Sequence, residues 1–196
     1  NVRIYNKALT SSEIQDHYEK YKLYYQPSFK FDRLNNNFIN LPYSNSHNLT
    51  EEISMDAWIR RTEINSEYYG VLGKFNNVIY FPRIENSGVI MAELTFNDGT
   101  TSGELEAGFV PANIWTHVAI TYSRNSGVVK IYQNGSEAGS FSVGTKQIRG
   151  PSNPFTIGRV VSSERYWNGS ISNVRIYNRS LSANQIFELY NSYNTT

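Results

Sequence analysis

The feature that most constrains this chain is a sequence repeated near its two ends. Residues 1–21 read NVRIYNKALTSSEIQDHYEKY and residues 173–193 read NVRIYNRSLSANQIFELYNSY, so ten of the 21 positions are identical. The copies lie 172 residues apart (173 − 1), which exceeds the roughly 20–50-residue period of a solenoid and equals the length of a domain. We therefore predict that residues 1–22 end a preceding module, 23–27 form a linker and 28–196 form one complete module.

Each copy predicts a short strand followed by a helix. The shared NVRIYN opening places valine and isoleucine on one face of an extended segment. Thr10 with Glu13 in the first copy, and Ser182 with Gln185 in the second, match the capping box that begins many helices. After each cap, an isoleucine and a tyrosine four residues later have helical spacing.

Between the copies, short runs rich in β-branched and aromatic residues alternate with turn signals. The predicted strands are Phe29–Arg33, Phe38–Leu41, Ile53–Arg61, Tyr69–Lys74, Val78–Ile84, Val89–Phe96, Trp115–Tyr122, Val128–Gln133, Ala138–Val143, Phe155–Val160 and Gly169–Tyr177. Asn134-Gly135 is the residue pair that a two-residue type I′ hairpin turn requires, because both positions need a positive φ. Many short strands with a single helix predict an all-β sandwich or barrel.

Composition excludes several classes of function. The chain carries 18 basic and 17 acidic side chains, so no field of one sign attracts nucleic acid. The absence of cysteine excludes disulfides, thiolate catalysis and cysteine-based zinc sites. No apolar run reaches the roughly 18 residues that predict membrane insertion. Five glycosylation sequons favour an extracellular or cell-surface glycoprotein, and their asparagines are Asn48, Asn134, Asn168, Asn178 and Asn194.

Five segments in chain order carry a family resemblance. They read FKFD at 29–32, ISMDAWI at 53–59, WTHVAITY at 115–122, VKIYQNG at 129–135 and WNGSISNVRIYN at 167–178. In this order they resemble the laminin-G-like domains of the concanavalin A-like lectin/glucanase superfamily. The resemblance implies a jelly-roll β-sandwich of two antiparallel sheets with one short C-terminal helix. It also implies a role in sugar binding or adhesion, without fixing the ligand.

The resemblance further implies a structural Ca²⁺ ion. The family's acidic positions match Asp32 and Asn173, so these two residues are the candidate metal ligands. Here the chain departs from the family pattern, since Arg33 stands where glycine is usual and Asn173 where aspartate is usual. A lost carboxylate and a nearby cation both weaken calcium binding.

The sequence predicts no catalytic site. A glycosidase needs two carboxylates across a groove, and the superfamily's alternating acidic run E-x-D-x-x-E is missing. The nearest match, Glu104 with Glu106, is better interpreted as a solvated strand edge. The three histidines, His17, His47 and His117, lack metal-ligand spacing, and His117 is interpreted as a structural residue of a core strand.

One predicted strand suggests a ligand-binding surface. In residues 53–61, Met55 shares the apolar face, whereas Asp56, Trp58 and Arg60 share the other face. Trp58 is either a stacking platform for a sugar ring, with Asp56 and Arg60 as hydrogen-bonding neighbours, or a side chain packed beneath a loop. We favour the second interpretation.

These observations lead to three functional hypotheses. The first is a non-catalytic structural or adhesive repeat of an extracellular protein. Such a repeat would associate head to tail with neighbouring copies, as in a filament, or bind cell-surface glycans. The alternative is a carbohydrate-binding module of a larger secreted enzyme. The third, a glycosidase domain, is disfavoured by the missing carboxylate run.

Overall fold

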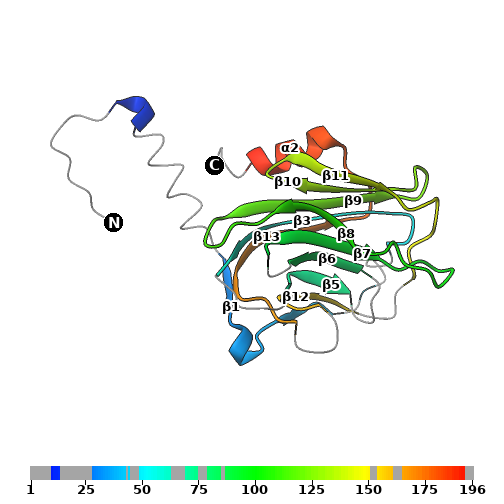
Figure 1. The fold of residues 1–196 in the computed structure, drawn as a ribbon, viewed down its shortest axis with the longest axis horizontal. Helices are drawn as coiled ribbons and strands as arrows, with labels where there is room; N and C mark the ends of the chain where they lie inside the picture. Colours follow the sequence, from blue (N-terminus) through cyan, green and yellow to red (C-terminus); the bar gives the residue numbers. More distant parts are fainter. Residues whose placement is uncertain are drawn as a thin grey trace.

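The chain is a sandwich of two antiparallel sheets with one helix across its outside (Figure 1). The computed structural model describes residues 10–13, 28–42, 44, 49–62, 69–74, 79–84, 87–150, 154–160 and 165–192. The predicted all-β fold with a short C-terminal helix is confirmed. Of the predicted end of a preceding module, only residues 10–13 belong to the described part, and the predicted linker lies outside it.

The first sheet, called sheet A here, joins the beginning and the end of the module. Its strands in spatial order are β1 (Phe29–Phe31), β13 (Gly169–Tyr177), β3 (Glu52–Arg61), β9 (Thr116–Ser123), β10 (Val128–Gln133) and β11 (Ser136–Ser142). The last strand of the module, β13, therefore lies between β1 and β3. The β10–β11 hairpin turns at Asn134 and Gly135, whose φ angles of 49° and 78° confirm the predicted positive-φ pair.

The second sheet, sheet B, faces sheet A across the core. Its strands in spatial order are β2 (Ile39–Asn40), β12 (Phe155–Ile157), β5 (Leu72–Lys74), β6 (Ile79–Ile84), β7 (Val89–Leu94) and β8 (Leu105–Phe109), with β4 (Tyr69–Gly70) also paired to β6. The sequence analysis did not predict β8 as a full strand. It is the edge strand of the sheet and Glu106 on it is exposed, in agreement with the strand-edge interpretation of Glu104 and Glu106.

Alternating side chains of both sheets form the core. On β3, Ile53, Met55, Ala57 and Ile59 are each at most 1% exposed, which confirms the predicted apolar face. Ile90, Ala92 and Leu94 of β7 belong to the same cluster. A core between two aligned sheets is the arrangement expected when each strand buries every second residue.

Helix α2 (Ala183–Asn191) follows β13 and packs on the outer face of sheet A. Its capping box is present as predicted: the Gln185 amide donates to Ser182 Oγ (3.3 Å), and the Ser182 amide donates to Gln185 Oε1 (3.0 Å). Beneath the helix lies a second, smaller apolar cluster, which consists of Ala119, Tyr132, Leu181 and Ile186 with Tyr177 and Leu189 at its border. The outer face of sheet A is thus closed by the chain's own C-terminal helix.

Candidate functional site

The predicted sugar platform on β3 lies beneath α2. The Trp58 ring is 2% exposed and stacks on Tyr190 of the helix, with ring centroids 5.6 Å apart and 20° between the planes. Asp56 is 1% exposed, and Arg60 is half-buried at the end of the strand. The structure therefore does not offer Trp58, Asp56 and Arg60 as an exposed surface. Trp58 is packed beneath another segment of the chain, as we favoured, but that segment is a helix rather than a loop.

The Asp56 carboxylate is the centre of a buried polar network. Arg175 of β13 donates to it through Nε (3.0 Å to Oδ2) and Nη2 (2.5 Å to Oδ2). His117 Nε2 lies 3.1 Å from the same oxygen, and the His117 ring is 5.9 Å from that of Tyr190. These polar contacts join β3, β9 and β13 within sheet A, as a buried carboxylate requires, and the ring contact with Tyr190 extends the cluster to α2. This agrees with the structural role predicted for His117.

The two predicted calcium ligands do not lie together. Asp32 caps the 3₁₀ helix η1 (Arg33–Asn35), where its Oδ1 accepts from the Leu34 amide at 2.9 Å and its Oδ2 from Asn35 Nδ2 at 2.8 Å. In the antiparallel register Phe31 pairs with Gly169 and Phe29 with Ile171, which places Asp32 and Asn173 beyond opposite ends of the β1–β13 ladder. The part of the chain that the structure describes contains no group of three or more histidine and acidic side chains positioned to hold a metal ion. Asp32 and Asn173 therefore do not fit a shared Ca²⁺.

The sequons occupy different environments. Asn134 and Asn178 are exposed and Asn168 is half-buried, whereas Asn48 and Asn194 lie outside the described residues. The Asn134 side chain also has a structural contact, because its Oδ1 accepts from the His117 amide at 3.0 Å. Glycosylation at any of them stays a prediction.

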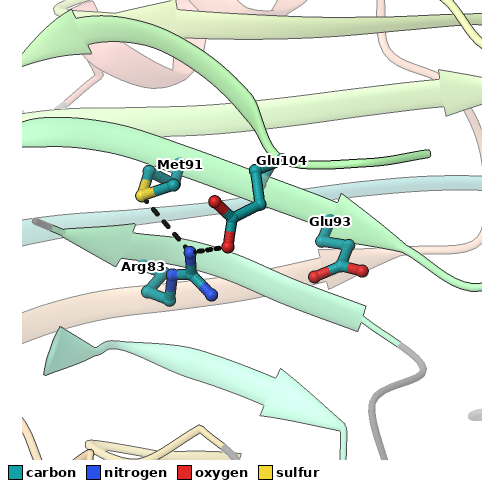
Figure 2. A pocket seen from close by; sticks show the side chains of 5 residues that line it. Arg83, Met91, Glu93 and Glu104 are labelled. Carbon is teal, nitrogen blue, oxygen red and sulfur yellow. Dashed lines mark hydrogen bonds and ion pairs between the residues drawn. The ribbon is translucent and has the colours of Figure 1, made fainter. Parts of the chain in front are cut away.

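The outer face of sheet B carries a small pocket of about 140 Å³ between β6, β7 and the segment before β8 (Figure 2). Arg83 extends from β6, and its Nη2 donates to Oε1 of Glu104 and lies 3.5 Å from Sδ of Met91. On β7, Ile90 and Ala92 face the core. Met91 and Glu93 alternate with them along the strand and therefore face outward. Met91 is 1% exposed and lines the pocket, whereas half of the Glu104 side chain (51%) is exposed.

Glu93 supplies a second carboxylate to the lining of the pocket. Figure 2 shows it on the same strand as Met91, apart from the ion pair between Arg83 and Glu104. Among the described residues, its oxygens have no hydrogen-bond or ion-pair partner. The pocket thus brings a guanidinium donor and two carboxylate acceptors together around the Met91 thioether, and hydroxyl groups both accept from such a donor and donate to such acceptors.

A second cluster lies at the β2 edge of sheet B. Phe38, directly before β2, is 39% exposed, and its ring lies 6.2 Å from that of Tyr166. The Arg159 guanidinium lies over both rings, 4.5 Å from the Phe38 centroid and 5.8 Å from the Tyr166 centroid. Within the described residues the guanidinium forms no hydrogen bond or ion pair. An exposed aromatic ring beside a guanidinium offers both a stacking surface and donors.

The sequence analysis did not single out Arg83, Glu93, Arg159 or Tyr166. Arg83 carried a usable signal, since a charged residue interrupts the apolar run of β6. Nothing in the sequence linked Phe38 to Arg159, because 121 residues separate them. Glu104, the nearest candidate for a catalytic acid, is paired with Arg83, while Glu106 lies one strand position beyond Leu105 on the exposed edge.

Residues 34–187 match a family model, Laminin_G_3, described as the concanavalin A-like lectin/glucanases superfamily. The chain belongs to this family. The match covers most of the module and agrees with the two-sheet architecture. A search of the curated protein sequences finds no match.

Several solved structures share the fold. The binding domain of Paraclostridial Mosquitocidal Protein 1 superposes with a TM-score of 0.71 at 18% identity, covering 85% of this chain and 43% of that one. A botulinum neurotoxin type C structure superposes with a TM-score of 0.62 at 20% identity, covering 80% of this chain and 40% of that one. The SAP-like pentraxin of Limulus polyphemus superposes with a TM-score of 0.56 at 17% identity, covering 78% of this chain and 81% of that one. The chain thus spans less than half of the two toxin chains.

In the described part of the chain, no helix has the length and apolarity required to cross a membrane.

Proposed function

We propose that this chain is a non-catalytic glycan-binding module that works outside the cell, with the outer face of sheet B as its binding surface. The observation that carries the proposal is the pocket that Glu93, Glu104 and the Arg83 guanidinium line together. Sugars present rows of hydroxyl groups that both donate and accept. Carboxylates accept from such hydroxyls and a guanidinium donates to them, so the set matches the chemistry of a saccharide edge.

The shape of the site favours contact with the edge of one sugar unit of a longer glycan. The pocket is a small hollow that does not enclose a ligand. Only part of a glycan would enter it, and the rest would lie across the sheet. The Phe38 ring at the β2 edge supplies an apolar surface of the kind on which a sugar ring stacks.

Family relatives support a binding role. The mosquitocidal relative is a binding domain, and cell entry of the botulinum type C toxin depends on interaction with two ganglioside molecules. These likenesses bear on the fold, and the pocket supplies the local chemistry. The sequons and the resemblance to laminin-G-like domains support an extracellular setting. Such a module serves a surface protein or a larger secreted enzyme equally well.

The non-catalytic assignment rests on the carboxylates. A glycosidase uses one carboxylic acid to protonate the leaving group and a second carboxylate on the opposite side of the bond. Glu104 is held by Arg83 in an ion pair, and Glu106 lies on an edge strand. We therefore expect no sustained hydrolysis of polysaccharides.

A glycan array followed by calorimetric titration of the best ligand tests the proposal. Glu93→Gln removes one charged acceptor with little change in shape, and we expect it to weaken binding about tenfold or more, since a hydrogen bond to a charged group contributes about 1.5–3 kcal/mol. Glu137→Gln is the matched control, because Glu137 pairs with Lys130 on sheet A, away from the pocket. Absence of any glycan ligand, or equal affinities of the two variants, would show the proposal to be wrong.

A further inference from the structure

The repeated sequence can be interpreted through its C-terminal copy, whose structure is described. We call residues 173–192, which comprise most of β13 and all of α2, the closing unit. Its positions that are identical in residues 1–21 make the contacts with the sandwich. Arg175 pairs with Asp56, and Tyr190 stacks on Trp58. The other identical positions in the apolar cluster beneath the helix are Tyr177, Leu181 and Ile186.

The positions that differ between the copies mostly face solvent. Phe187 is 51% exposed and is replaced by Gln15, and the exposed Glu188 is replaced by Asp16. Phe187 and Glu188 lie outside the apolar cluster beneath the helix. Leu189 is the differing position that borders the apolar cluster, and it is replaced by His17. The sequence of residues 1–21 therefore keeps the residue types that make the main buried contacts of the closing unit and differs mostly at positions that are exposed there.

The described part of the first copy has the same local structure as the second. The Thr10 amide donates to Glu13 Oε2 at 2.9 Å, and the Glu13 amide donates to Thr10 Oγ1 at 3.2 Å. This is the reciprocal capping box that Ser182 and Gln185 form at the start of α2. Residues 11–13 are helical, as are the corresponding residues 183–185.

The corresponding position in this chain's own sandwich is already occupied. The strand residues of the closing unit pair with β3, where Arg175 lies opposite Asp56, Ile176 opposite Met55 and Tyr177 opposite Ser54. The ring of Trp58 and the carboxylate of Asp56 are covered by the same unit. A second copy of the sequence has no equivalent surface left to cover in its own module.

We propose that residues 1–21 are the closing unit of a second sandwich module of the same kind, joined head to tail with this one. Arg3 pairs with an aspartate, and Tyr18 stacks on an aromatic ring, at the positions that correspond to Asp56 and Trp58. The partner is thus recognised by a carboxylate and an aromatic ring on neighbouring outward positions of one strand. This inference is independent of the proposed glycan site, and its tests measure stability alone.

The first test compares matched arginine variants in the full chain. Arg175→Ala removes the partner of the buried Asp56 carboxylate, and we expect the melting temperature to fall by about 6–12 °C, by analogy with other broken buried pairs in domains of this size. Arg3→Ala should leave the melting temperature within about 1 °C, because its partner belongs to another module. A fall similar to that of Arg175→Ala would place residues 1–21 on their own sandwich and overturn the proposal.

The second test asks whether residues 1–21 can close a sandwich. In a chimera of the full chain, the sequence of residues 173–193 is replaced by that of residues 1–21, which has the same length. We expect a cooperative melt within about 8 °C of the original protein, with the difference arising from Leu189→His. Adding Arg3→Ala within the transplanted segment should lower the melting temperature of the chimera by as much as Arg175→Ala lowers that of the original protein. A chimera without a cooperative transition, or one insensitive to that arginine, would overturn the proposal.

Discussion

The outer faces of the two sheets have similar polar side chains and opposite environments. On sheet A, Asp56 and Trp58 point away from the core, yet each is at most 2% exposed because α2 covers them. On sheet B, Glu93 and Glu104 also point away from the core, and they border an open pocket. The comparison shows that an outward-facing polar residue becomes a buried structural contact or stays open to solvent according to what lies above its strand.

The two methionines of the chain provide the comparison with the largest expected effect. Met55 and Met91 are each at most 1% exposed, but Met55 lies in the apolar core and Met91 lies 3.5 Å from the Arg83 guanidinium. Met55→Asp should unfold the module, because an unpaired buried carboxylate costs several kcal/mol against a total stability of about 5–15 kcal/mol. Met91→Asp should retain a cooperative melt, since the new carboxylate gains Arg83 as a partner.

Circular dichroism melts of both variants measure this difference. If the two substitutions proved equally damaging, the outer face of sheet B would be as closed as the core.

The two arginine–carboxylate pairs should differ in their contribution to stability, by less than the two methionine substitutions do. Arg175→Gln leaves the Asp56 carboxylate, which is 1% exposed, without its arginine partner, and we expect a loss of about 3 kcal/mol in the free energy of unfolding. Arg83→Gln leaves the Glu104 carboxylate, which is 51% exposed, and we expect about 1 kcal/mol, in the range of surface pairs. Urea titrations at neutral pH measure both values. Equal losses would contradict the distinction between a closed and an open face.

The smallest expected effect concerns alkaline pH and the closed face. Burial raises the pKa of Tyr132 and of Tyr177, both beneath α2, above the ordinary phenol value of about 10. The folded state thus holds these protons more tightly than the unfolded state. Their contribution is complete below pH 10 and is lost as pH rises through the folded-state pKa values. The melting temperature should therefore decline above pH 10.

Tyr132→Phe together with Tyr177→Phe is the control for that decline. The double variant lacks both ionisable phenols, so its melting temperature should fall less steeply between pH 10 and pH 11. An identical slope in both proteins would assign the alkaline loss to other groups.

Residues close in sequence set much of the structure by themselves. The alternation along β3 determined that Met55 faces one way and Trp58 the other, because successive side chains of a strand point to opposite faces. Asn134-Gly135 determined its turn, and Ser182 with Gln185 determined where α2 begins, because these contacts lie within a few residues. The repeat also identified the closing segment before its contacts were known.

Contacts between distant segments decided which outward faces are covered. Asp56 and Arg175 are 119 residues apart, and no local pattern indicates that they meet. The same holds for the pocket, where Arg83 meets Glu104 only because β6, β7 and β8 lie side by side in sheet B. The sequence also could not show that Asp32 and Asn173 lie apart, since the antiparallel register places them beyond opposite ends of one ladder. Strand alternation fixes the direction of a side chain, whereas its neighbours depend on sheet order and on the helix that packs above it.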